Sequence, residues 1–273
     1  MKMPRSRIPL ITTLIVLVFF YLPIVVLVIN SFNDSAHGSA WEGFTWRWYV
    51  ALWEDENTKR ALLNTLLVGF SSMVISTLLG TLGAWALHRY NGSLLQRSHT
   101  GVVWFPLMLP EILMGVSLLL FFGAIGSGFG PHMMVFAHAT FCVSYVVMVV
   151  SARLQDFDDA LLEAAQDLGA TWWQTTWKIL LPNLAPGILA GALLAFTLSV
   201  DDFVISFFVK GPGMTTLPVL VEGMIKKSPK PKIINSLSTL MILATFILLI
   251  SSQFLSGNIF ANRKRKLRSQ PAN

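Results

Sequence analysis

Long apolar stretches constrain this chain more than any other feature of its sequence. Six windows, each long enough to cross a membrane as a helix, follow one another along the 273 residues. A hydrocarbon core of about 30 Å needs roughly 20 helical residues. The windows run over residues 10–29, 61–87, 101–125, 131–152, 183–209 and 233–260. The first, second, fourth and sixth contain no Asp, Glu, Lys or Arg.

Composition agrees with a helical membrane protein. Hydrophobic residues make up 54% of the chain and charged residues 12%, and the mean hydropathy is +0.63, unlike an average soluble domain. The windows are continuous, whereas the strands of a membrane barrel give short segments of alternating hydrophobicity. We therefore predict an all-α integral membrane protein with six transmembrane helices. One transmembrane domain is expected over residues 1–262, followed by a basic tail over residues 263–273.

The first window has two interpretations. Lys2, Arg5 and Arg7 precede an apolar run, as they would in a secretory signal peptide. The run has 20 residues, however, whereas the apolar region of a signal peptide has about 7–15. We favour a retained first span.

Lysine and arginine are distributed unevenly around the windows. With the N-terminus in the cytoplasm, twelve of the twenty basic residues lie on the cytoplasmic side, as the positive-inside rule requires. Six spans then place both termini in the cytoplasm, together with the segment between the fourth and fifth spans. The last outer loop is an exception, with five lysines: Lys210, Lys226, Lys227, Lys230 and Lys232.

The common sequence motifs for nucleotide binding, metal binding and nucleophilic catalysis are absent. The sequence contains no phosphate-binding loop, no His-Glu-x-x-His and no nucleophile elbow, and the single Cys142 excludes an intramolecular disulfide. His132 and His138 fall on different faces of one helix, so a hydrogen bond between helices is favoured over metal ligation. The pI of about 9.6 reflects basic residues that flank the membrane. We expect no enzyme activity, no cofactor, no metal and no nucleic-acid partner.

The segment 153–183, between the fourth and fifth windows, is polar and helical in pattern. Asp156 or Asp158 suits the cap of a short helix, and Gly169 suits the left-handed residue after it. Thr171 predicts the cap of a second helix over residues 172–181, which Pro182 separates from the next span. Two short helices folded at a glycine form what we call the cytoplasmic knob.

The cytoplasmic knob also has two interpretations. It is either an amphipathic loop at the membrane surface or a docking site for a soluble partner. In the second case Ala164 and Ala165 allow close approach, and Glu163 accepts from a basic side chain. The pattern alone leaves both open.

Residues of the knob resemble the coupling loop of permease subunits in bacterial ABC importers. The fixed positions of that pattern are matched by Glu163, Ala164, Ala165, Gly169, Ile179, Leu181 and Pro182. The chain is identified as a member of the binding-protein-dependent transport system inner-membrane component family, with a family core at about 61–257. The resemblance implies the permease fold of type I ABC importers and a knob, Asp167 included, that docks on a separate ATPase.

Other segments are similar to the C-type permease subunit of spermidine/putrescine importers. These segments are 30–33, 41–49, 110–112, 138–142, 196–204, 211–212 and 216–218. The similarity implies polyamine import across the bacterial inner membrane. It also implies a homologous second permease subunit, an ATPase dimer and an external substrate-binding protein. Glu111, where an aspartate is common, and Lys232, near an expected Pro-Glu, depart from the pattern.

The windows contain three carboxylates, those of Glu111, Asp201 and Asp202. An ionisable group in a span costs roughly 2.5–3.5 kcal/mol on insertion scales and usually faces a cavity or a partner. In straight helices, Glu111 lies about 15 Å from the cytoplasmic end, near the midplane, and the two aspartates about 26 Å. We assign all three to the substrate path; the alternative for the aspartates is a link to a basic residue of another subunit.

Three further residues complete the predicted substrate path. Asp202 shares a helix face with Ser199 and Ser206 if residues 183–209 form one helix. Trp48 offers a ring to the methylene chain of a polyamine, or else belongs to the aromatic belt at the membrane surface.

Three other functions compete with polyamine import. An importer for another small solute has the same architecture, and a stand-alone secondary transporter or an intramembrane enzyme has a different one. Two related halves, typical of secondary transporters, are not evident in the sequence. An intramembrane enzyme would need a constellation of nucleophile, base or metal ligands, and the sequence shows none.

Overall fold

A computed structural model describes residues 8–35, 40–90, 92–227, 232–247 and 250. In this part of the chain the elements are helical, with one isolated antiparallel bridge between Asn33 and Phe44. The chain divides into two compact units. The first is Met1–Lys59 with Leu220–Thr245, and the second is Arg60–Val219 with Phe246–Asn273.

The first unit contains α1 (Ile8–Ser31), α2 (Arg47–Glu54) and most of α11 (Leu217–Lys227). It also contains most of an apolar helix, Lys232–Ile247. No residue in the most apolar window of α1 is buried. Because its side chains are apolar on every side, this helix is suited to contact lipid.

Polar contacts tie the end of α1 to its neighbours within the first unit. Ser31 Oγ lies 2.6 Å from the Tyr49 hydroxyl, and Ser236 Oγ donates to the Ser31 carbonyl at 3.2 Å. The Lys232 ammonium, buried, donates to Asn30 Oδ1 at 3.4 Å. Lys232, which departs from the family pattern, therefore packs against α1.

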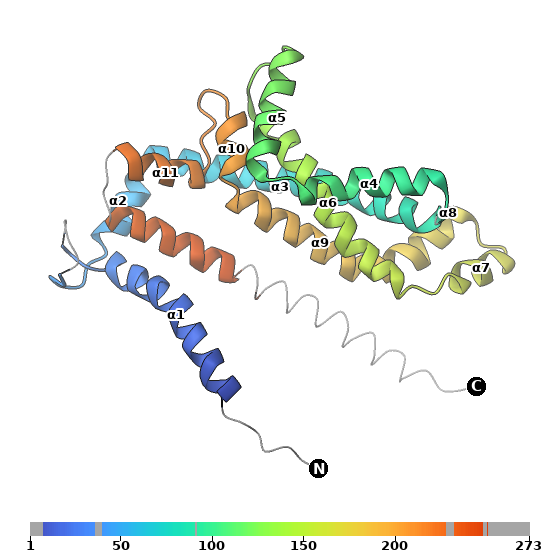
Figure 1. Cartoon of the computed structure of the whole chain (residues 1–273), viewed down its shortest axis with the longest axis horizontal. Helices are drawn as coiled ribbons and strands as arrows, with labels where there is room; N and C mark the ends of the chain where they lie inside the picture. Colours follow the sequence, from blue (N-terminus) through green and yellow to red (C-terminus); the bar gives the residue numbers. More distant parts are fainter. Residues whose placement is uncertain (1–7, 36–39, 91, 228–231, 248–249, 251–273) are drawn as a thin grey trace. The chain divides into compact units, whose positions relative to one another are not determined.

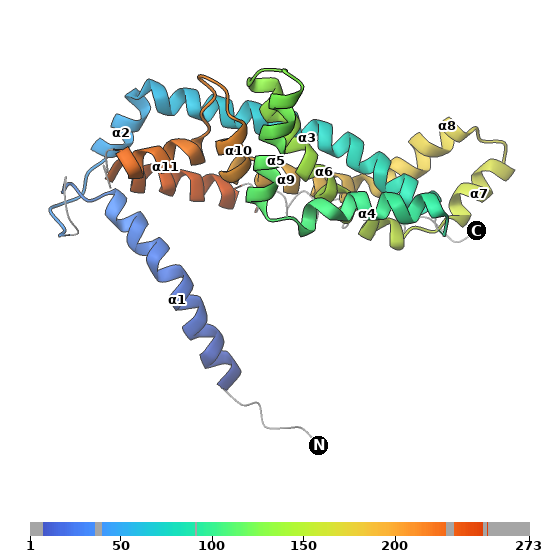
Figure 2. The same ribbon diagram turned by 45° about the horizontal axis from the view of Figure 1, so that its top comes forward.

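The second unit is built around α6 (Pro131–Gln155), which has more buried residues than the other helices of this unit in the described chain. In Figures 1 and 2, α6 and α9 (Leu181–Asp201) run side by side. Small residues allow this approach: a Cβ on Gly191 would lie 3.3 Å from Val146 Cγ1. On the other flank, α3 (Glu56–Arg89) comes closer, since a Cβ on Gly80 would lie 2.6 Å from Val146 Cβ.

Three predicted spans are confirmed as unbroken helices. Windows 10–29, 61–87 and 131–152 lie within α1, α3 and α6. The fifth window starts inside a fourth long apolar helix, Trp172–Asp201. Of the sixth window, the helix Lys232–Ile247 is described; most of the remainder and the basic tail lie outside the described residues.

The prediction of one continuous helix over residues 101–125 is wrong. The window is divided into α4 (Leu94–Met108) and α5 (Glu111–Ala124), which are bent by 110°. Leu109 is extended, with φ −77° and ψ 137°, because the residue before a proline disfavours the helical region. The described chain thus has four helices long enough to span, or five if this bent pair is one span, so the count of six is not matched.

The fifth window is also broken. The helix α9 ends at Asp201, and after Asp202 and Phe203 a short helix, α10 (Val204–Val209), begins. Figure 1 shows α10 next to α5. A Cβ on Gly115 of α5 would lie 2.7 Å from the Phe208 ring of α10, so the pieces beyond the two breaks pack closely.

Candidate functional site

The break between α9 and α10 is held by the side chain of Asp202. This residue leaves the helical region, with φ −67° and ψ 123°. Its Oδ2 accepts from the backbone N–H of Ser206 at 2.8 Å, and its Oδ1 from that of Ile205 at 3.3 Å. These are the N–H groups that the start of α10 leaves without intrahelical partners. Asp202 therefore caps α10.

An imidazole lies across the same break. His138 of α6 is fully buried; its Nδ1 lies 2.7 Å from Ser199 Oγ on α9, and its Nε2 lies 3.0 Å from Ser206 Oγ on α10. Nε2 is also 3.4 Å from Asp202 Oδ2, whose side chain is 6% exposed. Ser199 Oγ in turn lies 3.0 Å from Ser72 Oγ on α3. One buried polar cluster thus joins four helices of the second unit.

The predicted helix face through Ser199, Asp202 and Ser206 is wrong as geometry, because α9 ends before Asp202. The three side chains nevertheless come together, since each contacts His138. His138 was not assigned to the substrate path from the sequence. The prediction of a hydrogen bond between helices for this residue is confirmed, and a histidine in an apolar helix was the signal for it.

Two of the predicted acidic residues remain exposed. Asp201 is the last residue of α9, and Glu111 is the first residue of α5. Neither side chain forms an ion pair in the described part of the chain. The bend between α4 and α5 also removes the basis for placing Glu111 by its rise along one straight helix. Each exposed acid thus lies directly at a helix break.

Trp48 lies in the first unit, where its indole is fixed by local contacts. Its Nε1 donates to the Asn33 carbonyl at 2.8 Å. The Arg47 guanidinium lies 4.4 Å from the centroid of the Trp48 ring and 3.2 Å from Asp34 Oδ1. One face of the indole therefore already contacts a cation.

The cytoplasmic knob has the glycine turn that the sequence predicts. Its first helix is α7 (Ala160–Asp167), and Gly169 follows with φ +86°. The N–H of Ala170 donates to the Ala165 carbonyl at 3.0 Å, which closes the helix end. Asp158 Oδ1 accepts from the N–H of Ala160 at 3.0 Å, as expected for a residue near the helix start.

The second helix of the knob begins at the predicted residue but does not end at the predicted one. Thr171 caps α8 (Trp172–Thr175) in a capping box with Gln174. A π-helical segment, η1 (Thr176–Leu180), then leads directly into α9. The predicted separation at Pro182 is wrong, because Pro182 lies in the first turn of α9. A wider turn before a proline relieves the clash of its ring with the preceding carbonyls.

The first helix of the knob stands largely free of the protein. No residue of α7 is buried, and Glu163, Ala164 and Asp167 are exposed. Figure 2 shows α7 and α8 as two arms at one end of the second unit. Ile179 and Leu181 lie at the junction with α9, next to the buried Leu180.

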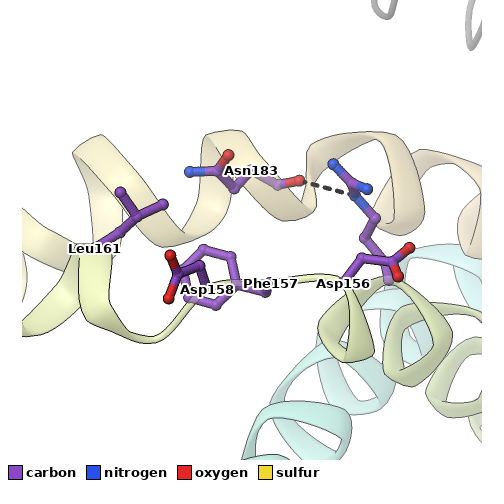
Figure 3. A pocket seen from close by; sticks show the side chains of 6 residues that line it. Asp156, Phe157, Asp158, Leu161 and Asn183 are labelled. Carbon is purple, nitrogen blue, oxygen red and sulfur yellow. Dashed lines mark hydrogen bonds between the residues drawn. The ribbon is translucent and has the colours of Figure 1, made fainter.

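Two pockets lie where the knob joins the spans. One, of about 200 Å³, lies between the end of α3 and the knob, where His88 Nε2 is 3.1 Å from Asp159 Oδ2. Glu163 is among its lining residues. The other, of about 120 Å³, is shown in Figure 3. There Arg153 Nε donates to the Asn183 carbonyl at 3.3 Å, which links the end of α6 to the start of α9.

Comparison with known proteins identifies the family. The model of the binding-protein-dependent transport system inner membrane component family matches residues 61–266. The chain belongs to this family. It is a multi-pass inner-membrane permease of a transport system, not an enzyme.

Two relatives cover most of the permease. It is 37% identical to the spermidine/putrescine transport system permease protein PotC of Haemophilus influenzae over 242 residues, which are 89% of this chain and 93% of the relative. It is also 37% identical to the putrescine transport system permease protein PotI of Escherichia coli over 269 residues, or 96% and 95% of the two chains.

Solved structures show the same fold. A bacterial ABC transporter involved in the import of the acidic polysaccharide alginate matches with a TM-score of 0.73 at 16% identity, over 92% of this chain and 94% of that chain. The MetNI methionine ABC transporter, in an inward-facing conformation, matches with a TM-score of 0.64 at 18% identity, over 74% and 95%. The permease therefore has the fold of ABC importer transmembrane subunits.

Proposed function

We propose that this permease forms, with a homologous second permease subunit, the membrane path of an ATP-driven importer for polyamines. Relatives that cover most of the chain are named as permeases for spermidine and putrescine. The observation on this chain that carries the proposal is Asp201, an exposed carboxylate at the carboxyl end of a broken helix.

The end of α9 has the chemistry that an ammonium group requires. The last turn of a helix leaves carbonyl oxygens without intrahelical donors and carries a partial negative charge. Asp201 adds a full negative charge at this place. A primary ammonium that reaches it makes charge-assisted hydrogen bonds. Glu111, which is exposed at the start of α5, offers a second carboxylate of this polypeptide to an ammonium group.

The predicted substrate-path residues then divide into two groups. Asp201 and Glu111, both exposed in the second unit, contact the ammonium groups. Asp202 and its two serine neighbours are buried and bonded within the chain. Their part is to shape the path at the helix break.

On the cytoplasmic side, the knob docks on an ATPase dimer. Support comes from α7, whose residues are all unburied and include Glu163, Ala164 and Asp167. Exposed carboxylates suit a basic cleft, and an exposed alanine permits close approach. Both termini lie in the cytoplasm in this arrangement, residues 1–262 act as one permease domain, and a substrate-binding protein delivers polyamine from outside.

Transport in a complete complex tests this function. Proteoliposomes that contain both permease subunits and the ATPase, with binding protein added, should take up radiolabelled spermidine or putrescine only with ATP. Asp201→Asn keeps the side-chain volume and removes the charge, so uptake should fall while the ATPase remains bound. Glu54→Gln, which changes an exposed acid at the end of α2, is the matched control.

Normal uptake by Asp201→Asn contradicts the proposed path. Uptake of neither polyamine by the parent complex points instead to another small solute, the alternative that the sequence left open. The stand-alone secondary transporter considered from the sequence is excluded by the family assignment.

A further inference from the structure

The buried cluster at the α9–α10 break has a directed hydrogen-bond chain. The Ser72 hydroxyl donates to the Val68 carbonyl. A hydroxyl has one proton, so Ser72 Oγ accepts from the Ser199 hydroxyl, 3.0 Å away. Ser199 Oγ then accepts from Nδ1–H of His138 at 2.7 Å. The α3 backbone therefore fixes which nitrogen of His138 carries a proton toward α9.

The other nitrogen of His138 faces the second half of the broken span. Nε2 lies 3.0 Å from Ser206 Oγ and 3.4 Å from Asp202 Oδ2. Asp202 is held in turn by two backbone N–H groups at the start of α10. One rigid ring thus contacts the last turn of α9 through Nδ1 and the first turn of α10 through Nε2.

A broken helix needs such a contact because the break itself has no backbone hydrogen bonds to hold its two pieces. Residue 202 is extended, and α10 has only six residues, too few for an isolated helix to be stable. The cluster is buried, so water does not compete with its hydrogen bonds. Asp201 is the last residue of α9, directly before the break. The angle at the break therefore sets how the Asp201 side chain lies relative to α10.

We infer that His138 is a positioning residue for translocation: it fixes the angle between α9 and α10 and thereby the direction of Asp201 at the break. The inference rests on the proposed role of Asp201 for its link to polyamine transport. The geometric part concerns the break alone and is testable without substrate.

Three substitutions separate the two contacts of the ring. His138→Asn retains a polar group near the Nδ1 position, toward Ser199. His138→Gln retains one near the Nε2 position, toward Ser206. His138→Leu removes both at similar volume. His132→Leu is the matched control, because His132 is an exposed histidine on the same helix.

A thiol at the first residue of α10 reports the state of the break. Val204→Cys is introduced in a Cys142→Ala background, since Cys142 is the single cysteine of the chain. The rate of reaction with a methanethiosulfonate reagent is then measured in the complete complex in nanodiscs, without ATP or polyamine. We expect His138→Leu to raise this rate about tenfold, the order expected when hydrogen bonds that oppose local opening are lost.

The Asn and Gln variants should react at rates between those of the parent and the Leu variant, and His132→Leu at the parent rate. Uptake by His138→Leu should fall roughly tenfold or more, as misplaced contact groups do, with the ATPase still bound. Parent-like reaction rates in all three His138 variants overturn the inference, as does an equal rise in His132→Leu. If the complex with His138→Leu does not assemble, the labelling rates of His138→Asn and His138→Gln decide whether the inference holds.

The two proposals fail in different ways. Normal uptake by Asp201→Asn contradicts the substrate path but leaves the labelling result intact. Unchanged labelling in the His138 variants contradicts the positioning role, whatever the Asp201→Asn variant does.

Discussion

Gly169 offers a sharp test of the knob because its environment isolates one physical effect. The residue has φ +86°, and a Cβ added there meets nothing within 4 Å. Gly169→Ala therefore causes no steric clash with neighbouring atoms, and its cost is that of a left-handed backbone in an L-residue with a Cβ. That cost is about 1–2 kcal/mol, which corresponds to a factor of roughly 5–30 in the population of the turn.

The loss of the turn is expected to appear in ATPase binding. When Gly169 leaves the left-handed region, the bond from the Ala170 N–H to the Ala165 carbonyl is lost, and α7 no longer meets α8 at the same angle. Titration of purified ATPase onto the permease complex in nanodiscs should then give a Kd about 5–30 times higher. Gly169→Asn should show a smaller rise, because asparagine tolerates this conformation. Gly169→Pro should show the largest.

Gly101→Ala is the control for this experiment. Gly101 lies on α4, and a Cβ added there also meets nothing within 4 Å, but its backbone is helical. Alanine is favoured over glycine in a helix by about 1 kcal/mol, so no loss of ATPase binding is expected. Equal affinities for Gly169→Ala and Gly101→Ala would refute the reasoning, since both positions have room for a Cβ and only Gly169 has a left-handed backbone.

Three further predictions follow from other parts of the chain. Glu163→Ala should release the ATPase from a chain that remains inserted, as measured by co-purification; full retention speaks against docking through α7. Gly80→Ala should destabilise the permease by about 1–3 kcal/mol, because the added Cβ would lie 2.6 Å from Val146 Cβ; an unchanged Tm in detergent contradicts the close packing of α3 on α6. The isolated chain should bind no ATP in a filter assay, because it lacks a phosphate-binding loop; saturable binding refutes the separate ATPase.

The unbroken spans were predictable because their signal is local. Length and apolarity alone determine that α1, α3 and α6 cross the membrane, and the structure has them within a few residues of the predicted bounds. The turn of the knob was predictable for a similar reason. Gly169 and the cap at Thr171 are residue types that a specific backbone conformation requires.

The breaks were not predictable, because proline alone does not decide them. Pro110 stands at the bend between α4 and α5, but Pro106 and Pro186 lie inside helices that continue. The break at Asp202 depends on the contact with His138, which is far away in the sequence. A histidine in an apolar helix signals a polar partner but does not name it, so Asp202 looked like a substrate ligand on a helix face.

The π-helical segment η1 places one extra residue between the knob and α9. A π-helical turn holds one residue more than an α-helical turn, and each residue of an α-helix advances the side-chain direction by about 100°. Deleting one residue within Thr176–Leu180 would leave an ordinary helix of nearly the same composition. The knob would then keep nearly the same direction around the axis of α9, because the wide turn and the shorter α-helical turn cover about the same rotation. The extra residue of η1 is therefore accommodated within one turn, and the side of the knob that faces outward does not depend on it.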